Sequence, residues 1–296
     1  MILSHTVTEI EKGRTVKWLL QNRLNLSGRL INKLKCDNKI LVNKLPVHVN
    51  YITDEGDVLE TLVEFEEENE DIIPQEMPLD IIYEDSSLIV LNKASNMVVH
   101  PTSYHPDGTY ANGLAAYFKK HGEAVKIRPV SRLDRDTTGV IVFAKNAYVQ
   151  ERLIKQMQTG AYEKKYIGAV WGNVLKESGV IDLPIARAPG SIMLRHISED
   201  GALAITEYKV IKRFKDATLL EFRLRTGRTH QIRVHCQAIG HDLIGETLYS
   251  DIETDLIGRQ PLHSYFTSFY HPLTQIKLEL TAPLPEDFKM LIENLE

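Results

Sequence analysis

Apolar residues in the first part of the chain recur at the spacing of amphipathic helices. The first predicted helix has five apolar positions: Val16, Leu19, Leu20, Leu24 and Leu26. Ser27 is a good N-cap for a second helix, whose apolar stripe is Leu30, Ile31 and Leu34. A short β element at residues 40–44 and a turn at 54–57 follow. Together these patterns predict a small α/β unit.

After residue 79, apolar runs of strand length predominate. Residues 81–85 and 88–93 flank an Asp-Ser-Ser turn and predict a hairpin. Further strands are expected at 140–144, 164–171, 202–214, 218–224 and 276–280. One helix is expected at 112–120, and a second is expected between its Asn146 cap and Gly160. Because strands predominate and helices are scattered, the predicted class is α+β with a mixed, mostly antiparallel sheet.

The composition is that of an ordinary globular protein. Its 296 residues are 43% hydrophobic, and no apolar run approaches the ~20 residues that a membrane-spanning helix needs. The start of the chain lacks the zones of a secretory signal. Cys36 and Cys236 lie far apart, so neither a disulfide framework nor a zinc cluster is expected. We expect a cytoplasmic protein.

Charge is distributed unevenly along the chain, although the net charge is only -5. Nine bases and one acid lie between Lys12 and Lys44, whereas ten acids and no base lie between Asp54 and Asp71. The expected division is therefore a basic domain at residues 1–66, an acidic linker at 67–78 and a larger domain at 79–296. In the basic domain three side chains can form a phosphate-contacting face: Arg29, Lys33 and Lys35. A merely solvated cationic face is the alternative.

Residues 132–139 read R-L-D-R-D-T-T-G and lead directly into the apolar run at 140–144. This order places Asp134 between Arg132 and Arg135, on a turn that feeds a rigid strand. A nearby guanidinium favours the ionised form of a carboxylate. We therefore expect a charged Asp134 that is held in one direction, as a nucleophile must be. The alternative is an exposed ion pair that tightens the turn, because such pairs are common and contribute only ~0 to 1 kcal/mol.

A second candidate segment is the strand at 163–171. Its alternation puts Tyr166 and Gly168 on one face, which leaves room for a flat base against the tyrosine ring. A tyrosine in a strand more often belongs to the core.

A third candidate segment lies at residues 226–240. Thr229 is expected to cap a helix with apolar positions Ile232, Cys236 and Ile239. His230 and Arg233 lie on a different face, and Arg228 near the helix start suits a phosphate. An amphipathic helix with a wet cationic side is the alternative.

The three segments read R-L-D-x-x-T-T-G, K-x-Y followed by Val-Trp-Gly, and T-G-R-x-H-Q-I-R-V-H. In this order the chain resembles the RluA-type family of RNA pseudouridine synthases over residues 79–296. Residues 12–64 resemble the S4 type of RNA-binding domain. The resemblance implies the pseudouridine synthase fold, with Asp134 as nucleophile, Tyr166 packed on the uracil and Arg233 paired with the aspartate.

The same resemblance implies an RNA partner and no cofactor or metal. Arg132 would contact the RNA near the vacated stack, and Arg228 and His230 are further candidates for RNA contact. Ribosomal RNA is favoured over transfer RNA, and a monomer is expected. The chain departs from the family pattern at Ser131, Ala94, Asn96, Asp242, Glu246 and Ser250. These departures concern substrate choice more than chemistry.

Three other functions are alternatives to this one. A metal-dependent hydrolase would need His230 with His235, or His100 with His105, but a separation of five residues turns a helix by about 140 degrees. A glycosidase using Asp134 and Asp136 would need carboxylates on two sides of a sugar, ~5 to 9 Å apart. The third is an RNA-binding or assembly protein that has kept the fold and lost turnover.

Overall fold

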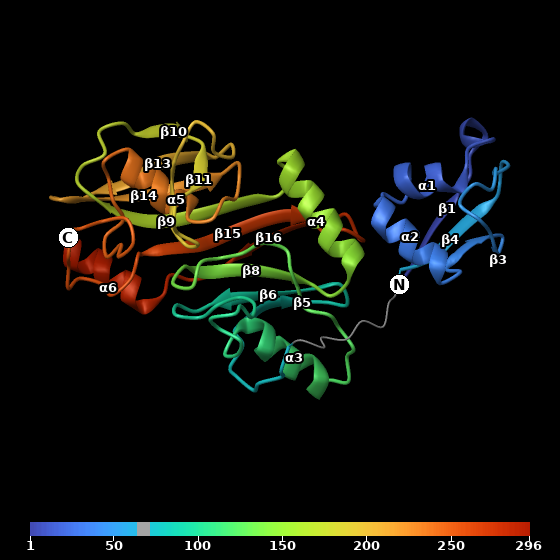
Figure 1. Cartoon of the computed structure of the whole chain (residues 1–296), viewed down its shortest axis with the longest axis horizontal. Helices are drawn as coiled ribbons and strands as arrows, with labels where there is room; N and C mark the ends of the chain where they lie inside the picture. The colour runs from blue at the N-terminus through green and yellow to red at the C-terminus, as the bar shows by residue number, and fades with distance from the viewer. Residues whose placement is uncertain (64–71) are drawn as a thin grey trace.

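The computed structural model describes residues 1–63 and 72–296, and the chain forms a small N-terminal unit and a larger one (Figure 1). In the N-terminal unit four strands pair in the order β1-β4-β2-β3. They are β1 (Ile2–Thr6), β2 (Ile40–Val42), β3 (Leu45–Pro46) and β4 (Val58–Leu62). A short 3-10 helix, η1 (Glu9–Glu11), and two α-helices, α1 (Val16–Asn22) and α2 (Gly28–Cys36), complete the unit. The predicted small α/β unit is confirmed.

The second helix of this unit is built as its sequence predicts. The Ser27 side chain accepts a hydrogen bond from the backbone N–H of Leu30, at 3.2 Å, and thereby caps α2. The apolar stripe is buried: Leu30, Ile31 and Leu34. The three cationic candidates on α2 are exposed: Arg29, Lys33 and Lys35. The apolar and cationic faces of α2 are therefore distinct.

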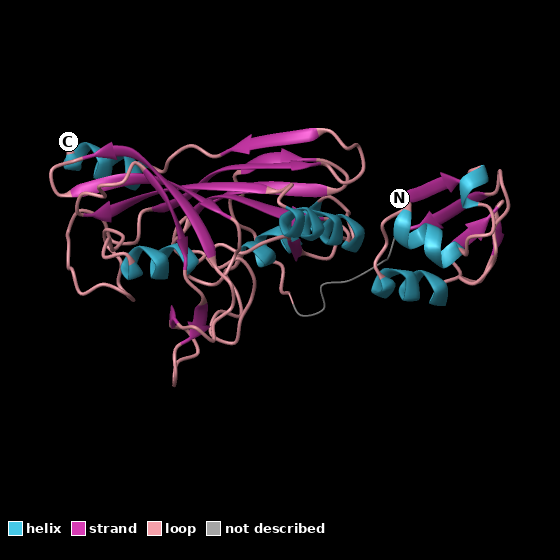
Figure 2. Cartoon of the chain, turned by 90° about the horizontal axis from the view of Figure 1, so that it is seen from above, coloured by secondary structure: helices cyan, strands magenta, loops and turns pink. Residues whose placement is uncertain are grey.

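The larger unit is organised around one twisted sheet, which Figure 2 shows from above. Among the described residues, eight strands follow the order β10-β13-β14-β9-β15-β8-β6-β5, while β16 pairs with β15 and β7 with β8. Their bounds are β5 (Ile81–Glu84), β6 (Leu88–Lys93), β7 (Arg128–Pro129), β8 (Thr138–Ala144), β9 (Glu163–Trp171), β10 (Ser178–Asp182), β13 (Ile205–Arg213), β14 (Ala217–Leu224), β15 (Leu262–Tyr270) and β16 (Lys277–Thr281). Strands β8 and β15 are parallel and the other described pairs of this sheet are antiparallel. The predicted α+β class with a mixed, mostly antiparallel sheet is confirmed.

Helices cover the apolar residues of this sheet. Side chains of α3 (Tyr110–Lys120) and α5 (Gln231–Ala238) share a core with Ile141 of β8. The next residue, Val142, points to the other face and shares a core with α4 (Ala147–Thr159). Helix α6 (Glu286–Leu295) packs in a separate core with residues of β9 and β14. A two-stranded hairpin, β11 (Ile185–Arg187) and β12 (Arg195–Ile197), lies outside the sheet.

The segment between the two units is described only in part. Residues 67–71 of the expected acidic linker lie outside the described residues, as does the proposed boundary at 66. Residues 72–78 lie along α3, since Gln75 N–H donates to the Asn112 carbonyl at 3.0 Å and the Asn112 amide donates to the Ile73 carbonyl at 2.8 Å. No helix within the described residues has the length and apolar character needed to cross a membrane.

Candidate active site

Asp134 lies on the turn between β7 and β8, and the turn is fixed by close backbone contacts. The Thr137 N–H donates to the Asp134 carbonyl at 3.2 Å. Gly139 has φ of +106°, and a Cβ there would lie 2.2 Å from the Ser264 carbonyl oxygen of the parallel strand β15. A glycine is therefore required for β8 to approach β15 so closely. This explains the glycine that ends the R-L-D-R-D-T-T-G stretch.

Two buried cations hold the carbonyl groups of this turn. Lys93 Nζ donates to the carbonyls of Arg135 at 2.6 Å and Thr137 at 2.9 Å. Arg259 Nη1 donates to the Asp136 carbonyl at 3.0 Å. Burial lowers the pKa of Lys93 to about 7, against the opposing effects of the Asp136 and Asp134 charges. Sequence reasoning missed both cations, although a lysine ending the apolar run of β6 was a visible signal.

Arg259 also ties the turn to the C-terminal helix. Its Nε and Nη2 atoms form a bidentate ion pair with Asp287, in the first turn of α6, at 2.7 and 2.9 Å. Three consecutive carbonyls after Asp134 thus accept hydrogen bonds from buried cations. The position of the Asp134 main chain is set by this support.

The basic side chains nearest to the Asp134 carboxylate come from α5 and its start. Arg233 Nη1 lies 3.7 Å from Asp134 Oδ2, and His230 Nε2 lies 3.9 Å from Oδ1. Arg132 instead donates to Thr229 Oγ1 at 3.4 Å, and Arg135 pairs with Asp136 at 3.0 Å. The expected support from the two flanking arginines is therefore replaced by support from Arg233 and His230.

Arg233 is itself held by a second carboxylate. Its Nε and Nη2 atoms donate to Glu246 at 2.7 and 2.5 Å, and both side chains are buried, with 6% and 1% exposed. The guanidinium also lies over the ring of Tyr249, 5.3 Å from its centroid. The hydrogen bonds to Glu246 and the charges of Glu246 and Asp134 raise the pKa of Arg233 against the effect of burial. Arg233 is therefore a fixed cation with Nη1 directed to Asp134.

Helix α5 begins two residues later than Thr229, so the predicted Thr229 cap is wrong. His230 occupies the N-cap position in the left-handed conformation, with φ of 58°, and makes no side-chain cap bond. The Gln231 side chain accepts from the Arg228 N–H at 2.9 Å. Arg228 is exposed, and its Nε donates to the Leu203 carbonyl at 2.9 Å. This geometry turns the His230 side chain toward Asp134.

Tyr166 lies on β9 in the same core as α5. Its side chain is 4% exposed. Burial raises the pKa of its hydroxyl, and the nearby charges of Tyr162 and Asp134 act in the same direction. The space beside Gly168 is occupied, since a Cβ there would lie 2.9 Å from Phe222 and 3.2 Å from Leu243. The expected room for a base beside this glycine is therefore filled by core side chains.

Two residues of the alternative functions, His235 and Asp136, are engaged elsewhere. Both ring nitrogens of His235 have partners, Thr206 Oγ1 and the Leu183 carbonyl, each at 2.9 Å. Asp136 pairs with Arg135 and accepts from the Asn96 N–H at 3.2 Å. Within the described part of the chain, no cluster of His, Cys, Asp or Glu side chains could hold a metal ion.

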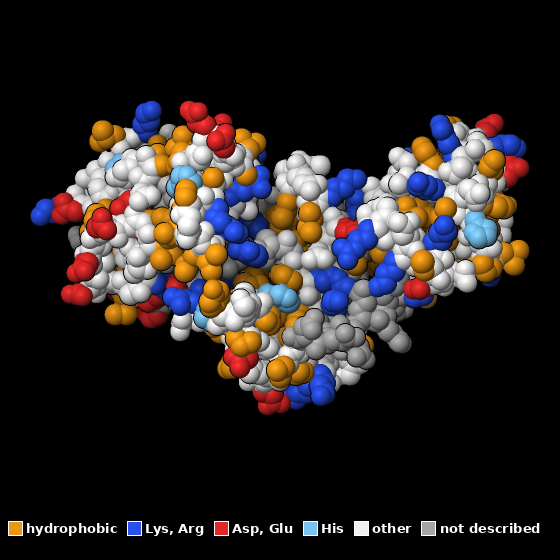
Figure 3. Space-filling view, viewed as in Figure 1, with side chains coloured by type: hydrophobic (Ala, Val, Ile, Leu, Met, Phe, Trp, Pro, Cys, Tyr) orange, Lys and Arg blue, Asp and Glu red, His pale blue; other side chains and the backbone are white. Residues whose placement is uncertain are grey.

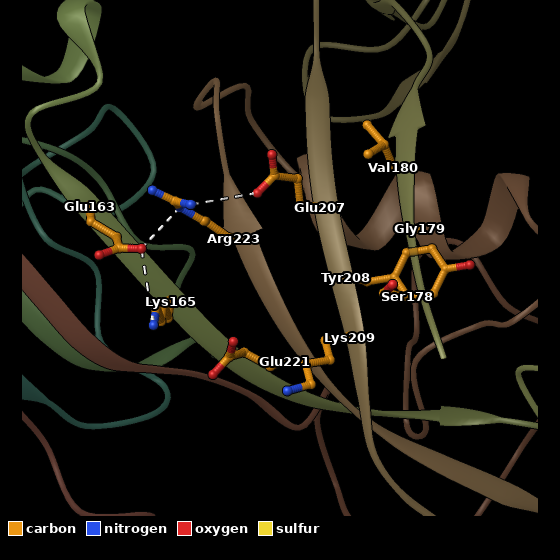
Figure 4. Close-up of a pocket in the computed structure, with 10 residues that line it drawn as sticks. All are labelled: Glu163, Lys165, Ser178, Gly179, Val180, Glu207, Tyr208, Lys209, Glu221 and Arg223. Atoms are coloured by element: carbon orange, nitrogen blue, oxygen red, sulfur yellow. Dashed lines mark ion pairs between the residues drawn. The ribbon is translucent and has the colours of Figure 1, made fainter. Parts of the chain in front are cut away.

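A groove of about 390 Å³ lies on the opposite face of β9 and β14 (Figure 4). Its charged side chains pair with one another: Arg223 lies 2.9 Å from Glu163 and 3.9 Å from Glu207, and Lys165 lies 4.0 Å from Glu163. None of the candidate site residues lines it. The candidate active site is instead the Asp134 turn with the start of α5.

Comparisons with known proteins identify the family of this chain. A family model described as RNA pseudouridylate synthase matches residues 87–238. The chain is 39% identical over 273 residues to the uncharacterized RNA pseudouridine synthase YjbO of Bacillus subtilis, covering 91% of this chain and 95% of that protein. It is 34% identical over 304 residues to ribosomal large subunit pseudouridine synthase D of Escherichia coli O157:H7, covering 98% and 88%.

Similarity to solved structures concerns the fold. The human RNA pseudouridylate synthase domain containing 4 superposes with a TM-score of 0.60 at 23% identity, over 73% of this chain and 92% of that one.

The family model covers residues 87–238, which include Asp134, Tyr166 and Arg233. The chain therefore belongs to the RluA-type family of RNA pseudouridylate synthases, which are RNA isomerases.

Proposed function

We propose that Asp134 is the nucleophile of this pseudouridine synthase and that Arg233 is its paired cation. The observation that carries the proposal is the separation of 3.7 Å between Arg233 Nη1 and Asp134 Oδ2. At this distance the pair attracts electrostatically without a direct hydrogen bond. Asp134 is also 21% exposed, whereas Glu246 is 1% exposed. Of the two carboxylates around Arg233, Asp134 can reach a substrate.

The reaction needs no cofactor in this proposal. The bond between ribose C1′ and uracil N1 breaks, the uracil turns, and a bond forms between C1′ and C5. The C5 proton is lost and N1 gains a proton, so atoms and electrons balance within the nucleoside. One carboxylate that attacks and later leaves is sufficient for this sequence.

The uridine must leave its stack to reach Asp134. Extrusion of a base costs a few kcal/mol, and packing on an aromatic ring returns ~1 to 3 kcal/mol. Tyr166 is the ring proposed for this contact. Since it is 4% exposed without substrate, we infer that the base contacts only one edge of the ring or that neighbouring side chains move on binding. A weakly paired uridine in a loop or junction is therefore the favoured target.

The proposed substrate is ribosomal RNA, with transfer RNA as the second choice. The Escherichia coli relative is named for the large ribosomal subunit and aligns with 98% of this chain. Arg132, Arg228 and His230 are proposed RNA contacts in the larger unit, and Arg29, Lys33 and Lys35 in the N-terminal unit. Figure 3 shows Lys and Arg side chains gathered across the middle of this face, on the larger unit and toward the N-terminal unit. A phosphate backbone would follow such a surface.

The division into an S4-like domain at residues 1–66, a linker at 67–78 and a catalytic domain at 79–296 is part of this proposal. A monomeric state and a cytoplasmic location are also part of the proposal. The two free cysteines suit the reducing conditions of the cytoplasm.

Chemical mapping of pseudouridine tests the substrate. Ribosomal and transfer RNA from a strain lacking this chain would be treated with a carbodiimide that marks pseudouridine and stops reverse transcription. We expect a stop in ribosomal RNA to disappear and to return with the wild-type gene, but not with Asp134→Asn. If a stop is lost only from transfer RNA, then transfer RNA is the substrate instead of ribosomal RNA. If no stop is lost from either RNA, the protein is better explained as an RNA-binding protein without turnover.

A further inference from the structure

The Tyr249 hydroxyl connects the β11–β12 hairpin to His230. It accepts a hydrogen bond from the backbone N–H of Arg195, on β12, at 3.0 Å. It also lies 2.6 Å from Nδ1 of His230. The two rings are nearly perpendicular, at 75°, with centroids 5.6 Å apart. This arrangement leaves the other ring nitrogen, Nε2, for the Asp134 side.

One position of the imidazole proton satisfies these contacts and also uses the Tyr249 proton. A phenol oxygen has one proton to donate, and the Arg195 N–H can only donate. If the Tyr249 proton is donated to Nδ1, that nitrogen is an acceptor and Nε2 carries the ring proton. The Nε2–H group then faces Asp134 Oδ1, 3.9 Å away.

Burial favours the neutral His230 ring and outweighs the combined effect of the surrounding charges. Burial is the largest effect and lowers the pKa of His230, and the positive charges of Arg233 and Arg195 act in the same direction. The charges of Asp134 and Glu246 oppose them. The imidazole is 10% exposed, and its residue is held in the left-handed region of φ, which is uncommon outside glycine. Backbone conformations of this kind persist where surrounding contacts impose them.

We propose that His230 is a positioning residue for the Asp134 nucleophile, and that Tyr249 directs it by fixing the tautomer that presents Nε2–H to the carboxylate. The inference rests on the proposed role of Asp134. The two carboxylate oxygens of Asp134 then have different surroundings, because Oδ2 faces the Arg233 cation at 3.7 Å and Oδ1 faces a neutral donor. Since the Arg195 N–H belongs to β12, the position of the β11–β12 hairpin sets the orientation of the tyrosine hydroxyl.

Tyr249→Phe tests this effect, because it keeps the ring beneath Arg233 and removes the hydroxyl together with its contacts to His230 and the Arg195 N–H. We expect the single-turnover rate of pseudouridine formation at saturating RNA to fall by roughly threefold to tenfold, the loss expected for one hydrogen bond. The dissociation constant for the same RNA should stay unchanged. Tyr83→Phe is the matched control, since it removes a hydroxyl that donates to Asp85 at 2.7 Å and should leave the rate unchanged.

A double-mutant cycle with His230→Asn shows whether the tyrosine acts through the histidine. Asparagine tolerates the left-handed conformation and lacks the imidazole. We expect the double variant to be no slower than His230→Asn alone. The inference would be overturned if the rate losses of the two single variants multiply in the double variant. It would also be overturned if Tyr249→Phe reacts at the wild-type rate or loses only RNA affinity. Residual activity in Asp134→Asn would overturn the proposed function itself, so the two failures are distinguishable.

Discussion

The Arg233 guanidinium faces two carboxylates but donates hydrogen bonds only to Glu246. The Asp134 carboxylate is therefore not held by a direct hydrogen bond to this cation. Glu246 receives two short hydrogen bonds, whereas Asp134 lies 3.7 Å from the remaining nitrogen. A nucleophile bound as tightly as Glu246 would have to break a buried ion pair before each attack. The glutamate therefore restrains the cation as well as neutralising it.

Glu246→Gln should release this restraint. The amide replaces one acceptor by a donor, so Arg233 turns toward Asp134 and binds it directly. We expect the chemical step to slow by roughly 10- to 100-fold, while RNA affinity changes little. The free energy of unfolding should fall by about 3 kcal/mol, because a buried cation is left partly unpaired. An unchanged single-turnover rate in a folded variant would contradict this role.

Lys93, which supports the same turn, makes the free energy of unfolding depend on pH. Its pKa is lowered to about 7 in the folded chain from the usual 10.5. Between these two pKa values Lys93 binds more protons in the unfolded chain than in the folded chain. Its contribution to the free energy of unfolding therefore rises with pH, by at most ~1.4 kcal/mol per pH unit. Below pH 7 the cost of burying the charge is fully present.

Lys93→Met removes this dependence and leaves the Arg135 and Thr137 carbonyls without their donor. Free energies of unfolding measured in urea at about pH 7.5 and 9.5 should show wild type gaining roughly 2 kcal/mol over the variant across this interval. Parallel pH dependences of the two proteins would contradict the lowered pKa.

At the scale of elements, the turn that carries Asp134 depends on how closely β8 approaches β15. Gly139→Ala places a Cβ 2.2 Å from the Ser264 carbonyl in a backbone conformation that alanine rarely adopts. We expect a loss of about 3 kcal/mol or more in the free energy of unfolding. Gly28→Ala is the control, because its Cβ meets nothing within 4 Å. Equal stabilities of the two variants would contradict the account of this contact.

Local patterns in the sequence predicted elements better than they predicted the site. The Asn146 cap, the Gly160 end of α4 and the β5–β6 hairpin were correct, since each depends on a few neighbouring residues. Strand β1 was missed because its short alternating sequence resembles an unstructured start. Helix α6 was also missed, although its sequence has acids in the first turn.

The contacts around Asp134 could not be read from sequence spacing. Lys93, Arg259 and Glu246 join the site from β6, the segment before β15 and the loop after α5, so only the tertiary fold brings them together. The Gly168 surroundings show the same limit, because alternation gave the correct face of β9 but not the side chains that fill it. Motif resemblance located Asp134, Tyr166 and Arg233, whereas their support came from the structure.

At the scale of the whole molecule, the proposal requires the N-terminal unit to add phosphate contacts to those of the larger unit. Replacing the three exposed cations of α2 by glutamine should weaken binding to structured RNA and reduce the slope of log affinity against log salt by about 2 to 3. These cations are Arg29, Lys33 and Lys35.

Three exposed lysines of the larger unit provide the matched control: Lys209, Lys277 and Lys289. Their replacement by glutamine changes net charge equally and should leave the slope unchanged. Filter binding over a range of salt concentrations measures both variants. Equal slopes for the two triple variants would remove the N-terminal unit from the RNA-binding surface.

The most direct test of the account is single-turnover release of tritium from RNA labelled at uridine C5, with Asp134→Asn as the variant. The amide keeps the size of the side chain and removes the charge that faces Arg233. We predict no tritium release above background, with RNA affinity within about twofold of wild type. Release at the wild-type rate would show that another group attacks the nucleoside and would contradict the assignment of Asp134 as the nucleophile.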